Sequence, residues 1–480
     1  MLARIKGCAS RLLPKNTFAR GVSVLVGGTA SAQMLMVLAS PLLTRLYSPE
    51  DFGLLAVYGG LLGIVVVIAS LRYELAIPLP ESDREAASLA VLSLLVVVAV
   101  SLLSAGVVWF AGKPIANVLG VPQLADFFWL LPLGVLLQGT YKIFSYWSVR
   151  TRQFSSIART RIRQALTTLA IQLIGFKFGG VALVAGQASG QGMGSVSLAR
   201  LALRNAAFGQ WYWRDIWQVA KRYRNFPLFS TWSGLFNTAG SQLPALMFAA
   251  LFGVGAAGLY ALAHRVLAMP MSLVGNAIGK VFLSNAAEAY RQNRLSPLVS
   301  KVHDKLAKIA MPPVLVLMVL GPDLFALVFG EQWRAAGEFA RWMAPWLYMV
   351  FITSPLSTLI SVMEKERQGL LFQVTLLIAR GTAIAIGAWY GELMVAVILF
   401  SIASLLCYVG FLVWIAVITG NTFESIVSPT LQATATSLIA VLPLWLGLQW
   451  PITHWLWWSS LICAAGFILL HYWRLLYKAY

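Results

Sequence analysis

Stretches of about 20 mostly apolar residues recur from one end of this 480-residue chain to the other. A helix of that length crosses about 30 Å of hydrocarbon. Only helices and closed barrels satisfy their backbone hydrogen bonds there. Charged residues make up 11% of the chain, against about 25% in a soluble protein, too few to cover a water-facing surface. The sequence therefore predicts an all-α polytopic membrane protein.

Fourteen transmembrane helices account for the apolar stretches, with basic or turn-forming residues between them. Their predicted ranges are 21–45, 52–73, 86–110, 125–148, 163–179, 181–203, 228–252, 255–285, 306–329, 336–361, 369–389, 392–418, 428–448 and 453–473.

The basic residues fix the orientation of these spans. If both termini are cytoplasmic, 29 of the 36 Lys and Arg residues fall on the inner side and only five on the outer side, as the positive-inside rule requires. The segment 419–427 has no Lys or Arg, so hydropathy alone places the last two spans. The net charge of +19 is thus explained by short inner loops, and nucleic acid is not expected as a partner.

A short repeat suggests internal symmetry. Thr29-Ala30 with Gln33 in the first span matches Thr238-Ala239 with Gln242 in the seventh. Blocks of six spans enter the membrane from the same side, and transporter sites lie near mid-depth between such repeats. We therefore expect two six-helix lobes and an appended helix pair: an N-lobe at 1–205, a cytoplasmic interfacial linker at 206–227, a C-lobe at 228–420, and the last pair with the tail at 421–480.

Three arginines are candidates for the transport path. Arg265 and Arg380 interrupt apolar spans, and Arg72 ends the second span. A charge at mid-bilayer costs about 3 kcal/mol or more, so such residues usually face a cavity. The alternatives are snorkelling or a structural pairing for Arg265 and Arg380, and an ion pair or lipid-headgroup contact for Arg72.

Polar amides form a second group of candidates. They lie within predicted spans, and a sugar headgroup would need neutral hydrogen-bonding groups of this kind; they are Gln33, Asn237, Gln242, Gln187 and Gln191. Interhelical hydrogen bonding is the alternative role for each of them.

Catalytic motifs are missing from the sequence, which has no Walker loop, HExxH or GxSxG pattern and no metal-binding spacing among its three cysteines. We expect no catalytic residue, metal or cofactor. No carboxylate interrupts the first span or the middle of the seventh, and proton or sodium coupling is left open.

Three motifs in order resemble Wzx-type polysaccharide repeat-unit flippases of the multidrug/oligosaccharidyl-lipid/polysaccharide exporter superfamily. The first runs from Leu43 to Gly53 (LTRLYSPEDFG) and the second from Arg72 to Pro80 (RYELAIPLP), followed by Asp83-Arg84-Glu85-Ala86. The third is Phe329-Gly330-Glu331-Gln332-Trp333 with Ala344-Pro345.

This resemblance implies the V-shaped fold shared by multidrug-and-toxin extruders (MATE) and the lipid II flippase MurJ. The implied substrate is an undecaprenyl-pyrophosphate-linked oligosaccharide, from O-antigen or exopolysaccharide synthesis, moved to the periplasmic leaflet of the bacterial inner membrane. Arg265 matches the eighth-span position where a basic residue is often found. Membrane lipids, a polysaccharide polymerase and a chain-length regulator are the implied partners.

Three other functions compete with this interpretation. A drug/cation antiporter of the same fold would need buried carboxylates, and a lipid II flippase would share the mechanism. A membrane polysaccharide polymerase or ligase would be an enzyme, and the short, nearly uncharged outer loops argue against it.

Overall fold

The computed structural model describes residues 17–209, 211–447 and 455–477. The predicted N-terminal basic residues Arg4, Lys6, Arg11 and Lys15, and the predicted boundary between the last two spans, lie outside these ranges. The described residues contain helices and no strand, so the all-α expectation is confirmed. The chain divides into two compact units, Met1–Gly258 and Leu259–Tyr480.

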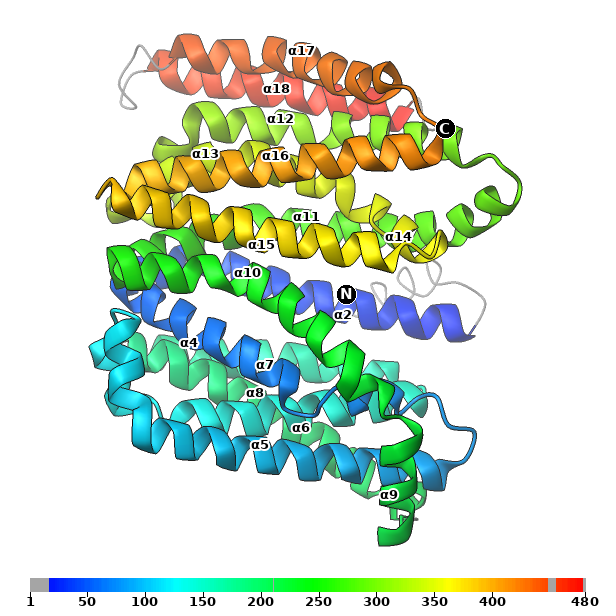
Figure 1. Cartoon of the computed structure of the whole chain (residues 1–480). Helices are drawn as coiled ribbons and strands as arrows, with labels where there is room; N and C mark the ends of the chain where they lie inside the picture. The colour runs from blue at the N-terminus through cyan, green and yellow to red at the C-terminus, as the bar shows by residue number, and fades with distance from the viewer. Residues whose placement is uncertain (1–16, 210, 448–454, 478–480) are drawn as a thin grey trace, which may run out of the picture. The chain divides into compact units, whose positions relative to one another are not determined.

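Unit 1 is a bundle of helices that runs from blue to green in Figure 1. The strongest packing joins α7 to α8, α6 to α8, α2 to α7, α4 to α10 and α5 to α6. Its elements are α2 (Thr17–Leu38), α3 (Ser40–Leu46), α4 (Pro49–Ile68), η1 (Tyr73–Ala76), α5 (Asp83–Val118), η2 (Pro122–Phe127), α6 (Leu130–Arg150), α7 (Phe154–Ile174), η3 (Phe176–Phe178), α8 (Gly180–Leu203), η4 (Ala206–Gly209), α9 (Trp213–Arg222), η5 (Phe226–Ser230), α10 (Thr231–Phe252) and the start of α11 (Val254–Arg291).

Unit 2 holds most of α11 and the helices drawn from green to red in Figure 1. Here α12 packs against α13 and α17, and α16 packs against α13 and α15. The remaining elements are α12 (Leu295–Phe329), η6 (Glu331–Trp333), α13 (Arg334–Leu356), α14 (Leu359–Val362), α15 (Glu366–Trp389), α16 (Leu393–Thr419), α17 (Phe423–Gly447) and α18 (Trp455–Tyr477).

The first motif builds the start of α4. The Ser48 hydroxyl accepts from the Asp51 amide, and the Asp51 carboxylate accepts from the Ser48 amide, forming a capping box before the apolar run. The other Asp51 oxygen accepts from the Gly180 amide at the start of α8, at 2.5 Å. The Tyr47 hydroxyl donates to the Gln172 carbonyl on α7. The motif therefore ties three helices together.

Two glycines let α4 and α11 meet backbone to backbone at the end of unit 1. A Cβ on Gly53 would lie 1.9 Å from the Val254 carbonyl oxygen, and one on Gly258 would lie 1.8 Å from the Pro49 carbonyl oxygen. Neither position has room for a side chain. This contact and the packing of α10 on α4 place both α10 and the first turn of α11 in unit 1.

The predicted interfacial segment contains the amphipathic helix α9, which docks on the N-terminal end of α5. Ile216 and Val219 are buried, whereas Trp217 is exposed. Two ion pairs hold the helix, Arg84 with Asp215 at 2.5 Å and Arg222 with Glu85 at 2.8 Å. The Arg84 guanidinium, which donates hydrogen bonds to Asp215, lowers the pKa of that carboxyl.

Each of the fourteen predicted ranges overlaps a helix, but several helices extend further. α7 begins at Phe154 and includes Arg159 and Arg161, which precede the predicted range 163–179. Conversely, α4 ends at Ile68, short of the predicted 73.

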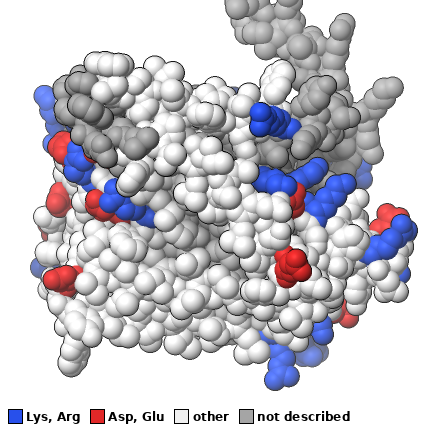
Figure 2. All heavy atoms as spheres, turned by 90° about the horizontal axis from the view of Figure 1, so that it is seen from above, with Lys and Arg blue, Asp and Glu red and all other residues white. Residues whose placement is uncertain are grey.

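Eight helices of the described residues are long and apolar enough to cross a membrane. The other long helices, α6, α7, α8, α11, α17 and α18, are not among them; α7 carries three arginines, and α8 is rich in Gly, Ser and Gln. The count of fourteen crossings thus stays a prediction. Figure 2 shows a wide uncharged zone on one face, with charged side chains gathered on either side of it, the pattern of a membrane-embedded surface.

The appended pair is fixed to α12 by polar contacts. His303, fully buried on α12, lies 2.9 Å from the Ile426 carbonyl oxygen on α17. The Tyr472 hydroxyl on α18 donates to the Ile309 carbonyl at 2.8 Å. The last two predicted spans are therefore packed parts of unit 2.

Candidate functional site

The second motif forms an irregular turn after α4. Leu71 and Arg72 have φ values of 48° and 62°, in the left-handed region. That conformation costs a residue with a side chain about 1–2 kcal/mol. The 3-10 turn η1 follows directly and contains Glu74. Such strain persists only where the surrounding structure holds it, and it is common at functional sites.

Glu74 is a buried carboxylate, only 2% exposed. The Ser70 hydroxyl donates to its Oε2. Arg72 and Lys142 lie close enough to Glu74 for their charges to form one interacting group, with the half-buried Tyr146 beside them. The turn after α4 therefore joins one carboxylate and two cations.

Arg72 is held against α10. A Cβ on Gly234 would lie 2.0 Å from an Nη of Arg72, so the guanidinium packs directly on the glycine. The Arg72 Nε is buried and has no hydrogen-bond partner among the described residues. The Tyr73 hydroxyl donates to the Ala220 carbonyl at 3.3 Å, which links the same turn to α9.

Lys142 lies within a helix, inside the predicted range 125–148. It stands in α6, eight residues before Arg150. The Arg150 guanidinium donates to the Pro80 carbonyl at 2.5 Å and to Asp83 at 2.8 Å, at the C-terminal end of α6. At 1.5 Å per residue, Lys142 lies about 12 Å from Arg150 along the axis of α6.

Two predicted amides lie against glycines of α4. A Cβ on Gly59 would lie 3.9 Å from the Gln187 Nε2, and one on Gly63 would lie 3.4 Å from the Gln242 Nε2. Gly59 and Gly63 are one helical turn apart, so α8 and α10 bring their amides to the same helix.

The other three predicted amides differ in environment. Gln191 Nε2 donates to Gln138 Oε1 at 3.3 Å, an interhelical bond between α8 and α6. Gln33 and Asn237 are exposed. For Gln191 the structure thus shows the alternative role, helix packing, that the sequence left open.

Arg380 is buried in an aromatic cage within unit 2. Its side chain is 7% exposed, and its Nε donates to the Ser404 hydroxyl at 2.9 Å. The guanidinium carbon lies 4.7 Å from the ring centroid of Trp346, 5.4 Å from Phe400 and 6.0 Å from Tyr408. Cation–π contacts of this kind offset part of the cost of burying the charge.

The cage extends to the residue before Arg265. The His264 ring stacks on Trp346 with centroids 6.2 Å apart, and Tyr260 stacks on His264 at 5.6 Å. Arg265 itself is half-buried, and the structure gives it no hydrogen bond or ion pair with any described residue. Arg380 is therefore enclosed by aromatic rings, whereas Arg265 is half-buried outside the cage.

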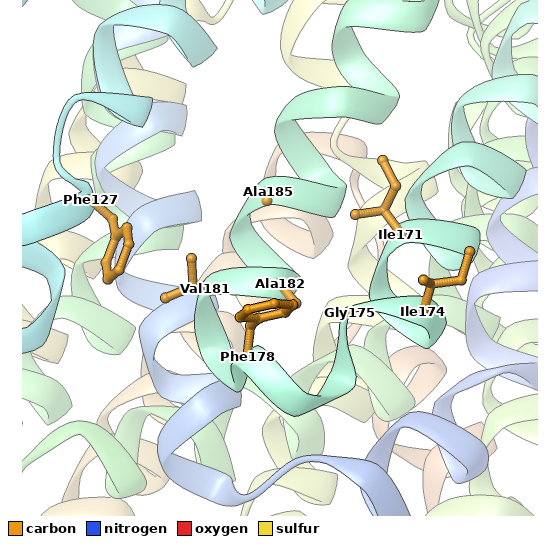
Figure 3. A pocket seen from close by; sticks show the side chains of 8 residues that line it. All are labelled: Phe127, Ile171, Ile174, Gly175, Phe178, Val181, Ala182 and Ala185. Carbon is orange, nitrogen blue, oxygen red and sulfur yellow. The ribbon is translucent and has the colours of Figure 1, made fainter.

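An apolar pocket of unit 1 lies elsewhere, with a volume of about 420 Å³. Figure 3 shows its lining, which includes Phe127 from η2, Ile171 from α7, and Phe178 and Val181 around the start of α8. It has no charged or amide side chain, so it cannot recognise a sugar or a phosphate.

The sequence did not predict that Glu74 is buried or that Lys142 is half-buried. A signal for Lys142 was present, because the predicted span 125–148 contains it. Glu74 carried no such signal, since it follows the apolar run and its burial comes from the turn that folds back.

Solved structures with the same arrangement of helices define the class. The lipid II flippase MurJ, in an inward closed conformation, gives a TM-score of 0.73 at 13% identity, covering 95% of this chain and 99% of that chain. An inward-facing MATE family multidrug transporter of the MOP superfamily gives 0.67 at 15% identity, covering 81% and 94%. The chain has the fold of these multi-pass transporters.

Sequence comparison adds the family. The profile of a family described as polysaccharide biosynthesis protein matches residues 42–338, and the chain belongs to this family. The succinoglycan biosynthesis transport protein ExoT of Rhizobium meliloti is 26% identical over 382 residues, which are 77% of this chain and 74% of ExoT. The teichuronic acid biosynthesis protein TuaB of Bacillus subtilis is 23% identical over 228 residues, 46% of this chain and 47% of TuaB. The family match and these two relatives confirm the resemblance to polysaccharide exporters that the three motifs indicate.

Proposed function

We propose that this protein is a flippase that moves a lipid-linked oligosaccharide repeat unit, carried on undecaprenyl pyrophosphate, from the cytoplasmic to the periplasmic leaflet. The family and the transporter fold support a role in polysaccharide export. O-antigen and exopolysaccharide units are both within this proposal, with a polymerase and a chain-length regulator acting after transport.

The observation that carries the proposal is Arg265. It is a half-buried cation in α11 to which the structure gives no hydrogen bond or ion pair within the described ranges. A permanent charge in such a place is costly unless it faces a polar path or a ligand. A pyrophosphate crossing a medium of low dielectric constant needs fixed positive charge, which a guanidinium supplies.

The antiporter alternative would need a carboxylate free to bind a cation. The buried carboxylate of unit 1, Glu74, interacts with two fixed positive charges, Arg72 and Lys142. That arrangement favours anions over drug cations. A lipid II flippase would share the anionic headgroup, and the family favours polysaccharide units over it.

The test is deletion of the gene, followed by analysis of surface glycan and of lipid-linked intermediates. We expect loss of surface polysaccharide and accumulation of the intermediate on the inner leaflet. Arg265→Ala should fail to complement while still inserting in the membrane, and Arg265→Lys should restore part of the export because it keeps the charge. Normal glycan in the deletion strain, with no second flippase present, would contradict the proposal.

A further inference from the structure

We propose that His303 is a proton-binding site at the joint between α12 and the appended helix pair. The neutral imidazole holds the start of α17 on α12, and a proton taken up by the ring releases it. The inference concerns the attachment of α17, so it stands apart from the choice of transported molecule.

The contacts of the imidazole define its neutral form. His303 is fully buried, and its Nε2 lies 2.9 Å from the Ile426 carbonyl oxygen. A carbonyl oxygen only accepts, so Nε2 carries the hydrogen of the neutral ring. The Thr430 hydroxyl lies 3.4 Å from the same nitrogen, and the Tyr348 hydroxyl on α13 donates to Thr430 at 3.4 Å. One imidazole therefore connects α12 with α17 and, through Thr430, with α13.

The second ring nitrogen is the place where a proton adds. Nδ1 of His303 is buried and has no hydrogen-bond partner among the described residues. Protonation turns this acceptor into a donor and gives the ring a charge. Burial of a charge and of an unpaired donor both cost free energy, whereas an imidazole in water takes up a proton near about pH 6.5. The attached ring is therefore favoured above about pH 6.5, and the released ring gains stability as the pH falls below that value.

The charged groups around the joint offer a protonated ring little compensation. Asp304, the next residue, shares its carboxylate with Lys308 at 2.6 Å. On α18, His471 places its Nε2 3.0 Å from the Lys308 carbonyl oxygen, at the neighbouring contact with α12. α16 carries no charged residue, and the phenol of Tyr348 on α13 stays neutral below about pH 10. Other charged side chains near these helix ends are exposed: Glu288, Arg291, Arg294, Lys301, Lys305 and Glu424.

Pro429 lets the start of α17 move apart from the rest of the helix. A proline has no N–H, so it cannot donate to the Ser425 carbonyl four residues back, and the helix is weakened at that point. Beyond the proline, Val441 packs with Leu320 of α12 in an apolar cluster. Loss of the His303 contact therefore frees the first turns of α17 while its apolar end stays packed.

Hydrogen exchange of the purified protein in detergent tests the proposal at about pH 7.5 and about pH 5.5, on either side of the ordinary pKa of an imidazole. Each rate is divided by the intrinsic exchange rate at the same pH, which gives a protection factor. One proton changes an equilibrium by up to about tenfold per pH unit. We therefore expect the protection of the amides at 427–434 to fall about tenfold at the lower pH, whereas amides around Val441 should keep theirs.

Two matched substitutions identify the histidine. His303→Gln removes the titratable ring and keeps an N–H donor for the Ile426 carbonyl, so protection at 427–434 should be equal at both pH values. His471→Gln makes the same change at the contact between α18 and α12 and should retain the loss of protection at low pH. Native-like protection of His303→Gln at about pH 7.5 would support the proposal, because the joint is then intact without the proton-binding group.

Equal protection at both pH values in the native protein would overturn the proposal, whatever the variants show. So would a loss of protection at low pH that persists in His303→Gln, or one that disappears in His471→Gln alone. If His303→Gln does not fold, His303→Asn takes its place in the comparison, since an asparagine amide also donates and does not titrate.

Discussion

Arg265 and Arg380 show how the environment of a residue sets its role. Both interrupt apolar stretches, and only Arg265 also matches a position where the resembling family often has a basic residue. Arg380 has a hydroxyl acceptor and three aromatic rings around it, and its guanidinium joins α13, α15 and α16. Arg265 has none of these contacts with the side chains that the structure describes. Binding of substrate by Arg380 stays a prediction, and a packing role is the better-supported one.

Replacement of Arg380 should therefore lower stability more than replacement of Arg265. We expect Arg380→Ala to destabilise the protein by about 2–3 kcal/mol, from the lost cation–π contacts and the cavity left in the cage. Arg380→Lys should recover part of this loss because it keeps the charge without the planar stacking. Thermal unfolding in detergent measures both, with Arg265→Ala as the matched control. An equal loss of thermal stability in Arg380→Ala and Arg265→Ala would show that the aromatic cage does not stabilise the protein.

At the scale of elements, one carboxylate explains how the first motif packs the ends of helices. Asp51 closes the capping box of α4 and accepts from the first amide of α8. The motif that carries the family resemblance is thus a device for packing helix ends. The second motif has a dual role, since Tyr73 and Arg84 hold α9 while Arg72 and Glu74 form the buried cluster.

Removal of the Asp51 carboxylate should loosen α4 from α8. Asp51→Ala loses a helix cap and a bond from a backbone amide to a charged oxygen, for an expected cost of about 2–3 kcal/mol. Thermal unfolding measures the cost, and hydrogen exchange should rise at the first turns of α4 and α8. Glu50→Ala, the exposed neighbour, is the control. Unchanged exchange at Gly180 in Asp51→Ala would rule out the link between the two helices.

At the scale of the molecule, hydropathy and charge predicted most of the architecture. The all-α class and the approximate places of the helices follow from apolar runs, because a backbone that crosses a bilayer must satisfy its own hydrogen bonds. The cluster at Glu74 did not follow, since it depends on the left-handed turn at Arg72 and on contacts between residues about 70 positions apart. Nor did the packing of α10 with α4, which small residues on facing helices allow but do not specify.

The predicted lobes and the compact units divide the chain differently. The predicted lobes are separated by the interfacial linker at 206–227, whereas the compact units separate after Gly258. The repeat assigns α10 to the C-lobe, whereas its packing on α4 places it in unit 1. The lobe boundaries stay a prediction about which helices move together during transport. The packing of α10 on α4 describes a single conformation of the protein.

The orientation of the whole chain rests on the distribution of Lys and Arg and is open to direct measurement. In a chain with Cys8, Cys407 and Cys463 replaced by serine, single cysteines would be placed at the exposed positions Lys177, Glu81 and Thr422. The cysteine at 177, between α7 and α8, should react with a membrane-impermeant maleimide in intact cells. Those at 81 and 422 should react only after permeabilisation, because both precede a span that starts from the inner side. Labelling of 422 in intact cells would mean an odd number of crossings before α17, and the final helix pair would then enter from the outside.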